Sequence, residues 1–215
     1  MKNLFAQIAV ILLLVTGSAF AQTQPLIDGK DPSAPDVDEK SVSKPELSES
    51  DKAKIEAELA NSLLTRLKGA QDASTAKTIE QAIWQLWLRH PSPSVELLMG
   101  QAVKAMTVGE NKKALRILTT VIELVPDYAE AWNKRATVYF YEGEYKRSLA
   151  DIDQVLDIEP RHFGALSGLG LVHQAMENKK EALKALRRAL KVHPFLEGAK
   201  DAEKRLEQEV EGEPI

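Results

Sequence analysis

The residues of this chain best suited to metal binding or proton transfer are its four histidines. Zinc sites on helices place two histidines at positions i and i+4, and no pair among His90, His162, His173 and His193 has that spacing. Three of the four stand at or beside evenly spaced boundaries in the sequence, where a structural role is sufficient to explain them. The histidines therefore predict no metal site and no catalytic centre.

Three short motifs begin like functional sites, and each lacks a required residue. The run Asp151-Ile152-Asp153 starts like a calcium loop, but Val155-Leu156 occupies places that need an oxygen ligand and a glycine. Gly168-Leu169-Gly170 lacks the third glycine and the preceding strand of a dinucleotide site. Ser167 lacks the two flanking glycines of a nucleophile elbow. We therefore expect no enzyme activity and no cofactor.

The composition excludes further classes of protein. Lys and Arg total 28 against 32 Asp and Glu, so the net charge of -4 provides no overall basic surface for a nucleic acid backbone. The chain has no cysteine, which rules out disulfides and an N-terminal lipid-modified cysteine. Its 215 residues, 44% of them hydrophobic, are enough for one core or one continuous solenoid. We expect one folded unit that does not bind nucleic acid.

Residues 1–21 have the order of a secretory signal peptide. Lys2 precedes the apolar run Ile8–Val15, and Ala19-Phe20-Ala21 forms an A-x-A cleavage site. This order predicts cleavage after Ala21 and a periplasmic location in a bacterium. The alternative is that Leu4–Phe20 remains as a membrane anchor, although it contains polar residues. The membrane would be a partner only in that second case.

Residues 22–50 are rich in proline and charge and poor in large apolar side chains. Such a segment cannot bury enough surface to offset the entropy of ordering, so we expect a disordered linker. Helical character begins at Ser50-Asp51, and Gly69 is expected to end the first helix. A second helix follows over Ala73–His90, stopped by prolines. Together these two helices predict a hairpin over residues 51–94.

The middle of the chain repeats every 34 residues, with Pro126, Pro160 and Pro194 in register. The repeat units are residues 95–128, 129–162 and 163–196, each long enough for two helices. Small residues recur where the paired helices would approach most closely: Ala102, Ala136 and Gly170, then Ala114, Ser148 and Ala182. The turn between helices carries Gly109 and Gly143, and in the third unit Glu177-Asn178, where we expect Asn178 to replace the glycine.

These residues resemble a tetratricopeptide repeat (TPR). The likeness is carried by Ala129-Glu130-Ala131-Trp132, Ala136, Tyr139, Gly143-Glu144-Tyr145, Ser148, Ile152 and Pro160. Gln101 and Arg135 depart from it, since the family usually has Leu there, as do Ala105 and His173, where it usually has Tyr. The resemblance implies an all-α solenoid, with the 51–94 hairpin as a degenerate repeat and residues 197–215 as a capping helix and tail.

The resemblance also implies a function, because the concave face of the family is a binding surface. It assigns that face to Met99, Val103, Met106, Glu130, Asn133, Thr137, Phe140, Tyr141, Ser167, Leu171 and Gln174. Their mixed apolar and amide character suits a peptide or helix of a protein partner. The alternative for Met106, Phe140 and Leu171 is that they only complete the packing. The clamp for a peptide carboxylate found in some members is disfavoured, because Gly164 and Gly168 stand where basic residues are needed.

The sequence therefore predicts a non-enzymatic adaptor or scaffold of the bacterial cell envelope. The alternative function is a membrane-anchored assembly factor with a periplasmic repeat domain. The third repeat unit is rich in lysine and arginine, which we expect on a solvated face. The alternative for these basic residues is that they attract an acidic partner or an anionic membrane. The sequence names neither the partner nor the oligomeric state.

Overall fold

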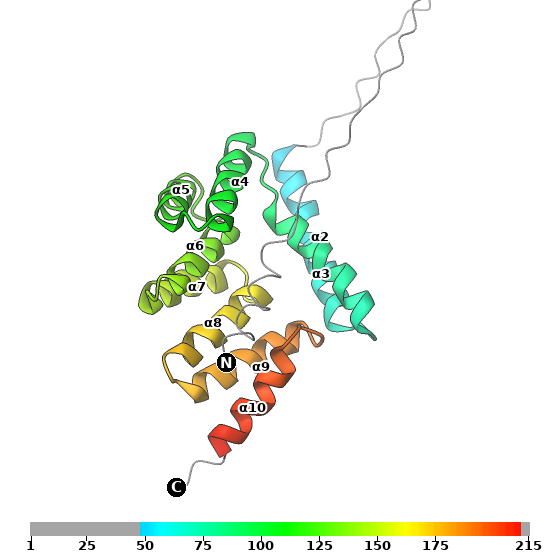
Figure 1. Cartoon of the computed structure of the whole chain (residues 1–215). Coiled ribbons are helices and arrows are strands. Elements are labelled where there is room, and N and C mark those ends of the chain that lie inside the picture. Colours follow the sequence, from blue (N-terminus) through cyan, green and yellow to red (C-terminus); the bar gives the residue numbers. More distant parts are fainter. Residues whose placement is uncertain (1–47, 212–215) are drawn as a thin grey trace, which may run out of the picture.

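The computed structural model describes residues 48–211, and within that range it contains nine helices and no strand (Figure 1). The helices are α2 (Glu49–Lys68), α3 (Ala73–Leu88), α4 (Pro93–Thr107), α5 (Asn111–Leu124), α6 (Ala129–Tyr141), α7 (Tyr145–Ile158), α8 (Phe163–Ala175), α9 (Lys179–Val192) and α10 (Ala199–Glu211). None of these helices is long and apolar enough to cross a membrane. The predicted signal peptide and nearly all of the predicted linker lie outside the described residues.

The three repeat units form three antiparallel helix pairs, α4–α5, α6–α7 and α8–α9. Each first helix ends in a turn with a left-handed residue, which is Gly109, Gly143 or Glu177. The prediction that Asn178 takes this conformation is wrong, because Glu177 has φ 61° and Asn178 has φ −81°. The left-handed place is fixed by the backbone bond that closes the helix, here from Asn178 N to His173 O at 2.8 Å. A non-glycine residue there costs about 1 kcal/mol.

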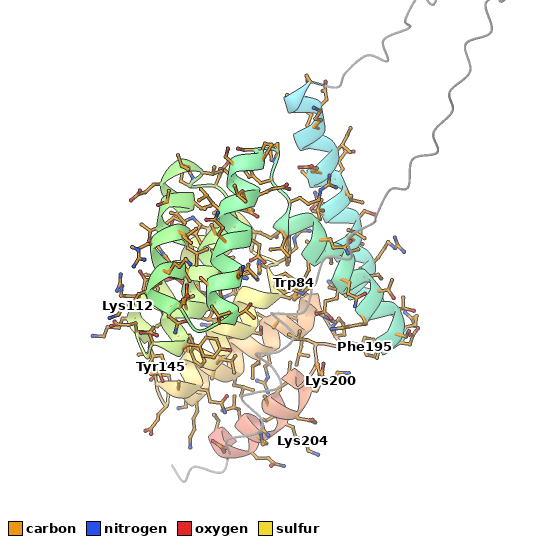
Figure 2. The ribbon with its side chains drawn as sticks, turned by 45° about the horizontal axis from the view of Figure 1, so that its top comes forward. Trp84, Lys112, Tyr145, Phe195, Lys200 and Lys204 are labelled. Atoms are coloured by element: carbon orange, nitrogen blue, oxygen red, sulfur yellow. The ribbon has the colours of Figure 1, made fainter. Side chains whose placement is uncertain are left out.

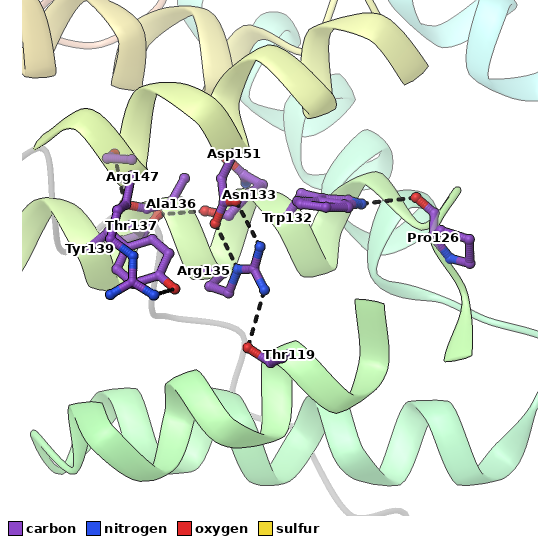
Figure 3. Close-up of polar contacts among 11 residues, drawn as sticks. Thr119, Pro126, Trp132, Asn133, Arg135, Ala136, Thr137, Tyr139, Arg147 and Asp151 are labelled. Atoms are coloured by element: carbon purple, nitrogen blue, oxygen red, sulfur yellow. Dashed lines mark hydrogen bonds and ion pairs between the residues drawn. The ribbon is translucent and has the colours of Figure 1, made fainter. Parts of the chain in front are cut away.

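Small residues lie where the paired helices approach, as the sequence predicts. Ala102 and Ala114 are fully buried in the apolar cluster of α4, α5 and α6. A Cβ atom on Gly170 would come within 3.0 Å of Leu186 Cγ, so α8 and α9 are closer than a larger residue allows. In the second pair, Ser148 Oγ donates a hydrogen bond of 2.8 Å to the carbonyl of Ala136 (Figure 3). The close approach of each pair follows from these residues.

Arg135, which departs from the family pattern, joins three helices (Figure 3). Its Nε and Nη2 atoms donate to the two carboxylate oxygens of Asp151 on α7, each at 2.8 Å. Its Nη1 atom donates to Thr119 Oγ1 on α5 at 3.1 Å, and its guanidinium lies over the Trp132 ring. The hydrogen bonds to Asp151 raise the pKa of Arg135 against the opposing effect of burial. This group, hereafter the Arg135 seam, replaces an apolar contact by a bidentate ion pair.

The N-terminal hairpin α2–α3 packs across the repeats instead of only preceding them. Its buried residues form one apolar cluster with Phe163 of α8, and Val192, Phe195 and Leu196 at the end of α9 pack against that cluster. The cluster that fills α4, α5 and α6 contains no residue of α2 or α3. Two hydrogen bonds add to the docking, from Tyr128 Oη to Leu88 O and from Arg161 Nη2 to Asn61 Oδ1. The hairpin therefore docks mainly on the second and third repeat units.

Helix α10 covers the apolar side of α9, in agreement with the cap expected from the sequence. Ala199, Ala202 and Leu206 of α10 form a cluster with Ala182, Leu183 and Leu186 of α9. At the rim of this contact, Arg187 forms ion pairs with Glu203 and Glu207. In Figure 1, α10 lies at the end of the array, beside the helices of the third unit. A terminal helix of this kind shields the last repeat from water.

Candidate functional site

A groove lies between the first helices of the second and third units, α6 and α8, and is also lined by residues of α10. It encloses about 130 Å³. Apolar side chains make up most of its wall: Ile152, Phe140, Tyr141, Leu171, Val172, Leu186 and Leu196. Such a mainly apolar concavity with a few polar groups is the usual form of a binding site for a peptide or a small molecule.

Seven of the eleven residues predicted for the concave face line this groove. They are Asn133, Thr137, Phe140, Tyr141, Ser167, Leu171 and Gln174, from α6 and α8. The structure brings them together, and whether they bind a partner stays a prediction. Tyr141 is 52% exposed at the groove, and burial raises the pKa of its hydroxyl. The residues at the mouth of the groove are therefore accessible to a guest.

The other four predicted residues lie outside the groove. Met99, only 3% exposed, and Met106 pack in the apolar cluster of α4, α5 and α6, and Val103 is half-buried on the same helix. Glu130 is 1% exposed, accepts a hydrogen bond of 2.6 Å from Asn133 Nδ2, and lies 3.4 Å from Lys134 Nζ. The first unit therefore adds nothing to the groove, because its α4 side chains are used in packing.

The polar groups of the groove differ in how far they are already satisfied. Thr137 and Ser167 donate their hydroxyl hydrogens to carbonyls of their own helices, at Asn133 O and Gly164 O. The side chains of Gln174 and Arg205, by contrast, make no hydrogen bond or ion pair with any other described residue. An amide and a guanidinium are thus left to pair with groups of a guest, such as its peptide bonds and a carboxylate.

Part of the groove comes from segments that the repeat pattern did not identify. Ala199, Ala202 and Arg205 of α10 line it, as do Glu80 and Trp84 of α3. Figure 2 shows Trp84 between the hairpin and the helices of the repeats. The concave-face prediction considered only residues of the three repeat units, so it had no reason to include these. The glycines at 164 and 168 were the only hint, since they leave space on α8.

Trp84 and Trp87 of α3 rest on a group of residues hereafter called the α3 cradle: Lys134, His162, Phe163, Gly164 and His193. A Cβ atom on Gly164 would come within 2.5 Å of the Trp84 ring, so the glycine is required by the tryptophan. Trp87 stacks on His162 with ring centroids 4.1 Å apart and 12° between planes. Trp84 also packs edge-on against Phe163. The space at Gly164, where a carboxylate clamp would need a basic residue, is thus filled by the Trp84 indole.

The α3 cradle buries several ionisable groups. Burial lowers the pKa of His162 to about 4, although Glu130 acts in the opposite direction, so the ring is neutral near pH 7. Its Nδ1 atom accepts a hydrogen bond from Ala165 N at 3.1 Å and thereby caps α8. Its Nε2 atom has no hydrogen-bond partner and lies 3.8 Å from Glu130 Oε2. The neutral histidine therefore carries its proton on Nε2, towards a carboxylate.

Glu80 on α3 faces the same interior from the other side. Its Oε2 atom lies 3.4 Å from His193 Nε2 and 3.2 Å from Lys77 Nζ. Burial raises the pKa of this carboxyl, but the contacts with His193 and Lys77 outweigh burial and leave it below its usual value. Among residues 48–211, no three histidine or acidic side chains come together to hold a metal ion. Glu80 of α3 and His193 at the end of α9 are thus joined by a partly paired contact.

Comparison with protein families identifies the repeats. A family model described as "Tetratricopeptide repeat protein 21 ARM repeat" matches residues 22–152, and a "Tetratricopeptide repeat" model matches residues 133–196. A TPR repeat-containing protein of Rhizobium etli is 42% identical over 134 residues, which are 62% of this chain and 66% of that relative. The chain thus spans just under two thirds of that relative's length.

Solved structures show the same fold. The Sgt2 TPR domain from Aspergillus fumigatus matches with a TM-score of 0.53 and 22% identity, over 58% of this chain and 87% of that one. The first TPR of Spaghetti (RPAP3), solved with the HSP90 peptide SRMEEVD, has a TM-score of 0.53 and 20% identity, over 54% of this chain and 93% of that one. At such identities the likeness establishes the α-solenoid fold alone.

Proposed function

Because the chain belongs to the tetratricopeptide repeat family, we propose that it is a non-enzymatic interaction module that binds a peptide or helix of a partner protein in the groove between α6, α8 and α10. The family and fold are typically those of non-catalytic modules for protein interaction. The Spaghetti domain in complex with an HSP90 peptide is one such module. The observation that carries the proposal is the open apolar groove with seven predicted contact residues in its wall.

The chemistry of the groove indicates what the partner presents. Phe140, Tyr141 and Leu171 offer apolar surface for two or three apolar side chains of the guest. Gln174 supplies an unpaired amide for the main chain of the guest, and Arg205 supplies a cation on α10 for an acidic group. The ligand is therefore an apolar segment with an acidic residue at one end. The proposal includes no carboxylate clamp, because Trp84 fills the space at Gly164, where the clamp would need a basic residue.

We place this module in the envelope of a bacterium, as an adaptor or scaffold exported by residues 1–21. The signal-peptide pattern supports this location, and a chain without cysteine is compatible with an oxidising compartment. Sequencing the N-terminus of the mature protein tests it. A chain that starts at Gln22 supports export with cleavage, whereas an intact Met1 supports the membrane-anchored alternative.

The groove is tested by capture of partners from envelope extracts with the tagged full chain. Changing Phe140→Ala and Tyr141→Ala removes two of its aromatic walls, so we expect the captured partner to be lost. The matched control is Leu97→Ala, which removes an apolar side chain that is 64% exposed on α4, outside the groove. Capture of the same proteins by both variants would contradict the proposal.

A loss of capture must not reflect unfolding, so the stability of the variant is measured alongside. Tyr141→Ala by itself changes an exposed side chain, and we expect its free energy of unfolding to change by no more than about 0.5 kcal/mol. Urea unfolding followed by circular dichroism gives that value. A folded single variant that still loses most of the partner would assign the effect to contact in the groove.

A further inference from the structure

Helix α3 presents a compact recognition face to the repeats. Glu80, Trp84 and Trp87 have the spacing i, i+4 and i+7, which places all three on one side of a helix. Trp84 Nε1 donates to Glu80 Oε1 at 3.3 Å, and Lys77 Nζ lies 3.2 Å from Glu80 Oε2. The side chains of this face are therefore positioned by contacts within α3 itself. A separate helix with the same residues would present the same face.

The repeats meet this face with matching features. Gly164 leaves a notch for the Trp84 indole, the His162 ring stacks on Trp87, and His193 Nε2 lies 3.4 Å from the Glu80 carboxylate. Lys134 Nζ lies 5.4 Å above the Trp84 ring and adds a cation–π contact. Each of these features thus receives one side chain of α3: Gly164 receives Trp84, His162 receives Trp87, and His193 receives Glu80.

The contact is nevertheless incompletely satisfied. His162 Nε2 and His193 Nδ1 are buried without a hydrogen bond, as is His173 Nδ1 outside the cradle. Glu130 Oε1 also accepts no hydrogen bond and has only the ion pair with Lys134 Nζ at 3.4 Å. In α2, Ile55 and Leu59 are about half exposed, and the buried residues Leu63, Leu64 and Leu67 lie in its last turns. Unpaired buried groups and a partly packed hairpin lower the free energy needed to release α3.

We propose that the α3 cradle is a second binding site, for an amphipathic helix that presents a carboxylate and two aromatic side chains at i, i+4 and i+7. In the free protein this site is occupied by α3, which exchanges with an external helix of the same chemistry. The external helix comes from a partner protein, and the release of α3 also opens the wall that Trp84 and Glu80 form in the neighbouring groove. This inference goes beyond the proposed function, since the groove exists with α3 in place.

The test uses a fluorescent peptide with the sequence of residues 72–90 and the full-length chain. In the chain with Trp84→Ala and Trp87→Ala the resident helix docks weakly, so we expect the peptide to bind at least about tenfold more tightly than to the unaltered chain. Adding Gly164→Leu to that variant fills the notch and abolishes binding. Equal affinity for the variant and the unaltered chain, or binding that survives Gly164→Leu, would overturn the proposal.

Two controls make the result specific for the cradle. Trp132→Ala removes a tryptophan that packs on Arg135 and lies outside the cradle, so it should not increase the affinity of the peptide. A peptide in which both tryptophans are replaced by alanine should bind none of the chains. Phe140 and Tyr141 line the groove and lie outside the cradle, so adding Phe140→Ala and Tyr141→Ala should remove the groove partner and leave peptide binding to the cradle unchanged. Either proposal can therefore fail without the other.

A second measurement needs no variant and holds if the double variant does not fold. In the unaltered chain, hydrogen exchange of the α2–α3 amides should be faster than that of α6, and excess peptide should accelerate it further. The alanine peptide should leave the exchange unchanged. Protection of α3 equal to that of α6, or no response to the peptide, would refute the exchange of α3.

Discussion

The Arg135 seam and the α3 cradle both bury charged side chains, but they satisfy them to different degrees. In the seam, each of the three guanidinium nitrogens of Arg135 donates a hydrogen bond to Asp151 or Thr119, at 2.8–3.1 Å. In the cradle, His162 and Glu130 approach to 3.8 Å, and atoms of both residues have no hydrogen-bond partner. A buried ion pair holds two helices firmly only when its geometry and its remaining hydrogen bonds are complete. The comparison therefore contrasts a well-paired joint between helices with an incompletely paired one.

The largest effect is expected from breaking the Arg135 seam. Asp151→Ala leaves the Arg135 guanidinium without its bidentate partner between α5, α6 and α7. We expect the free energy of unfolding to fall by about 3 kcal/mol, the lower end for a broken buried pair, because Arg135 is partly exposed. Urea unfolding followed by circular dichroism measures the loss.

The third repeat unit provides the matched control for this variant. It has Leu169 and Ala185 at the places of Arg135 and Asp151. The double variant Arg135→Leu with Asp151→Ala reproduces that apolar pair and should recover most of the lost stability. A double variant as unstable as the single one would show that the charge of Arg135 is not what destabilises it.

The next effect concerns the cradle and depends on pH. Burial depresses the pKa of His162 in the folded protein to about 4, below its value of 6.5 in the unfolded chain. The folded state therefore binds fewer protons, so this stability is complete above pH 6.5 and is lost as the pH falls towards 4. At pH 5 the free energy of unfolding should be about 2 kcal/mol lower than at pH 7.

The control for the acid effect is His162→Asn, which keeps an acceptor for Ala165 N at the start of α8 and does not titrate. Unfolding by urea at pH 7 and at pH 5 should then give nearly equal free energies for the variant. Glu80, whose pKa is also lowered, loses its contribution at lower pH and leaves this window unaffected. A variant that keeps the full acid dependence would assign it to other groups.

The smallest effect is expected from Ser148→Ala in the second unit, next to the Arg135 seam. The first and third units have Ala114 and Ala182 at this place, so the substitution fits the helix pair. It removes one hydrogen bond of 2.8 Å to Ala136 O, and we expect a loss of at most about 1 kcal/mol. A loss of 3 kcal/mol in urea unfolding would mean that the hydroxyl, and not the ion pair, dominates this joint.

The sequence predicted the helix pairs well because their determinants are local. Prolines at the unit ends, glycines at the turns and small residues at the close approach all act within one pair of helices. The prediction that Asn178 replaces the turn glycine was wrong. The backbone hydrogen bond from Asn178 N to His173 O closes the helix and leaves the preceding residue, Glu177, in the left-handed conformation. Arg135 looked like a departure in packing until Asp151 on α7 was found opposite it.

The site was predicted only in part. Residues of α6 and α8 in the groove follow from their place in the repeat, whereas α10 and α3 enter it from outside the repeats. Met99 and Glu130 lie at the helix positions predicted for the concave face, but neighbouring helices bury them. Register on a helix tells which side a residue occupies, and the packing of other helices decides whether that side is open.

By itself, the amino-acid sequence determined the all-helical repeat architecture, since a period of prolines, glycines and small residues permits only paired helices at fixed spacing. Only the tertiary structure decided that the N-terminal hairpin docks on the repeats and contributes Glu80 and Trp84 to the wall of the groove. That decision rests on contacts such as Trp84 with Gly164 and Trp87 with His162. Shape complementarity between residues so far apart in the chain leaves no periodic signal, so it becomes visible only when the helices are packed together.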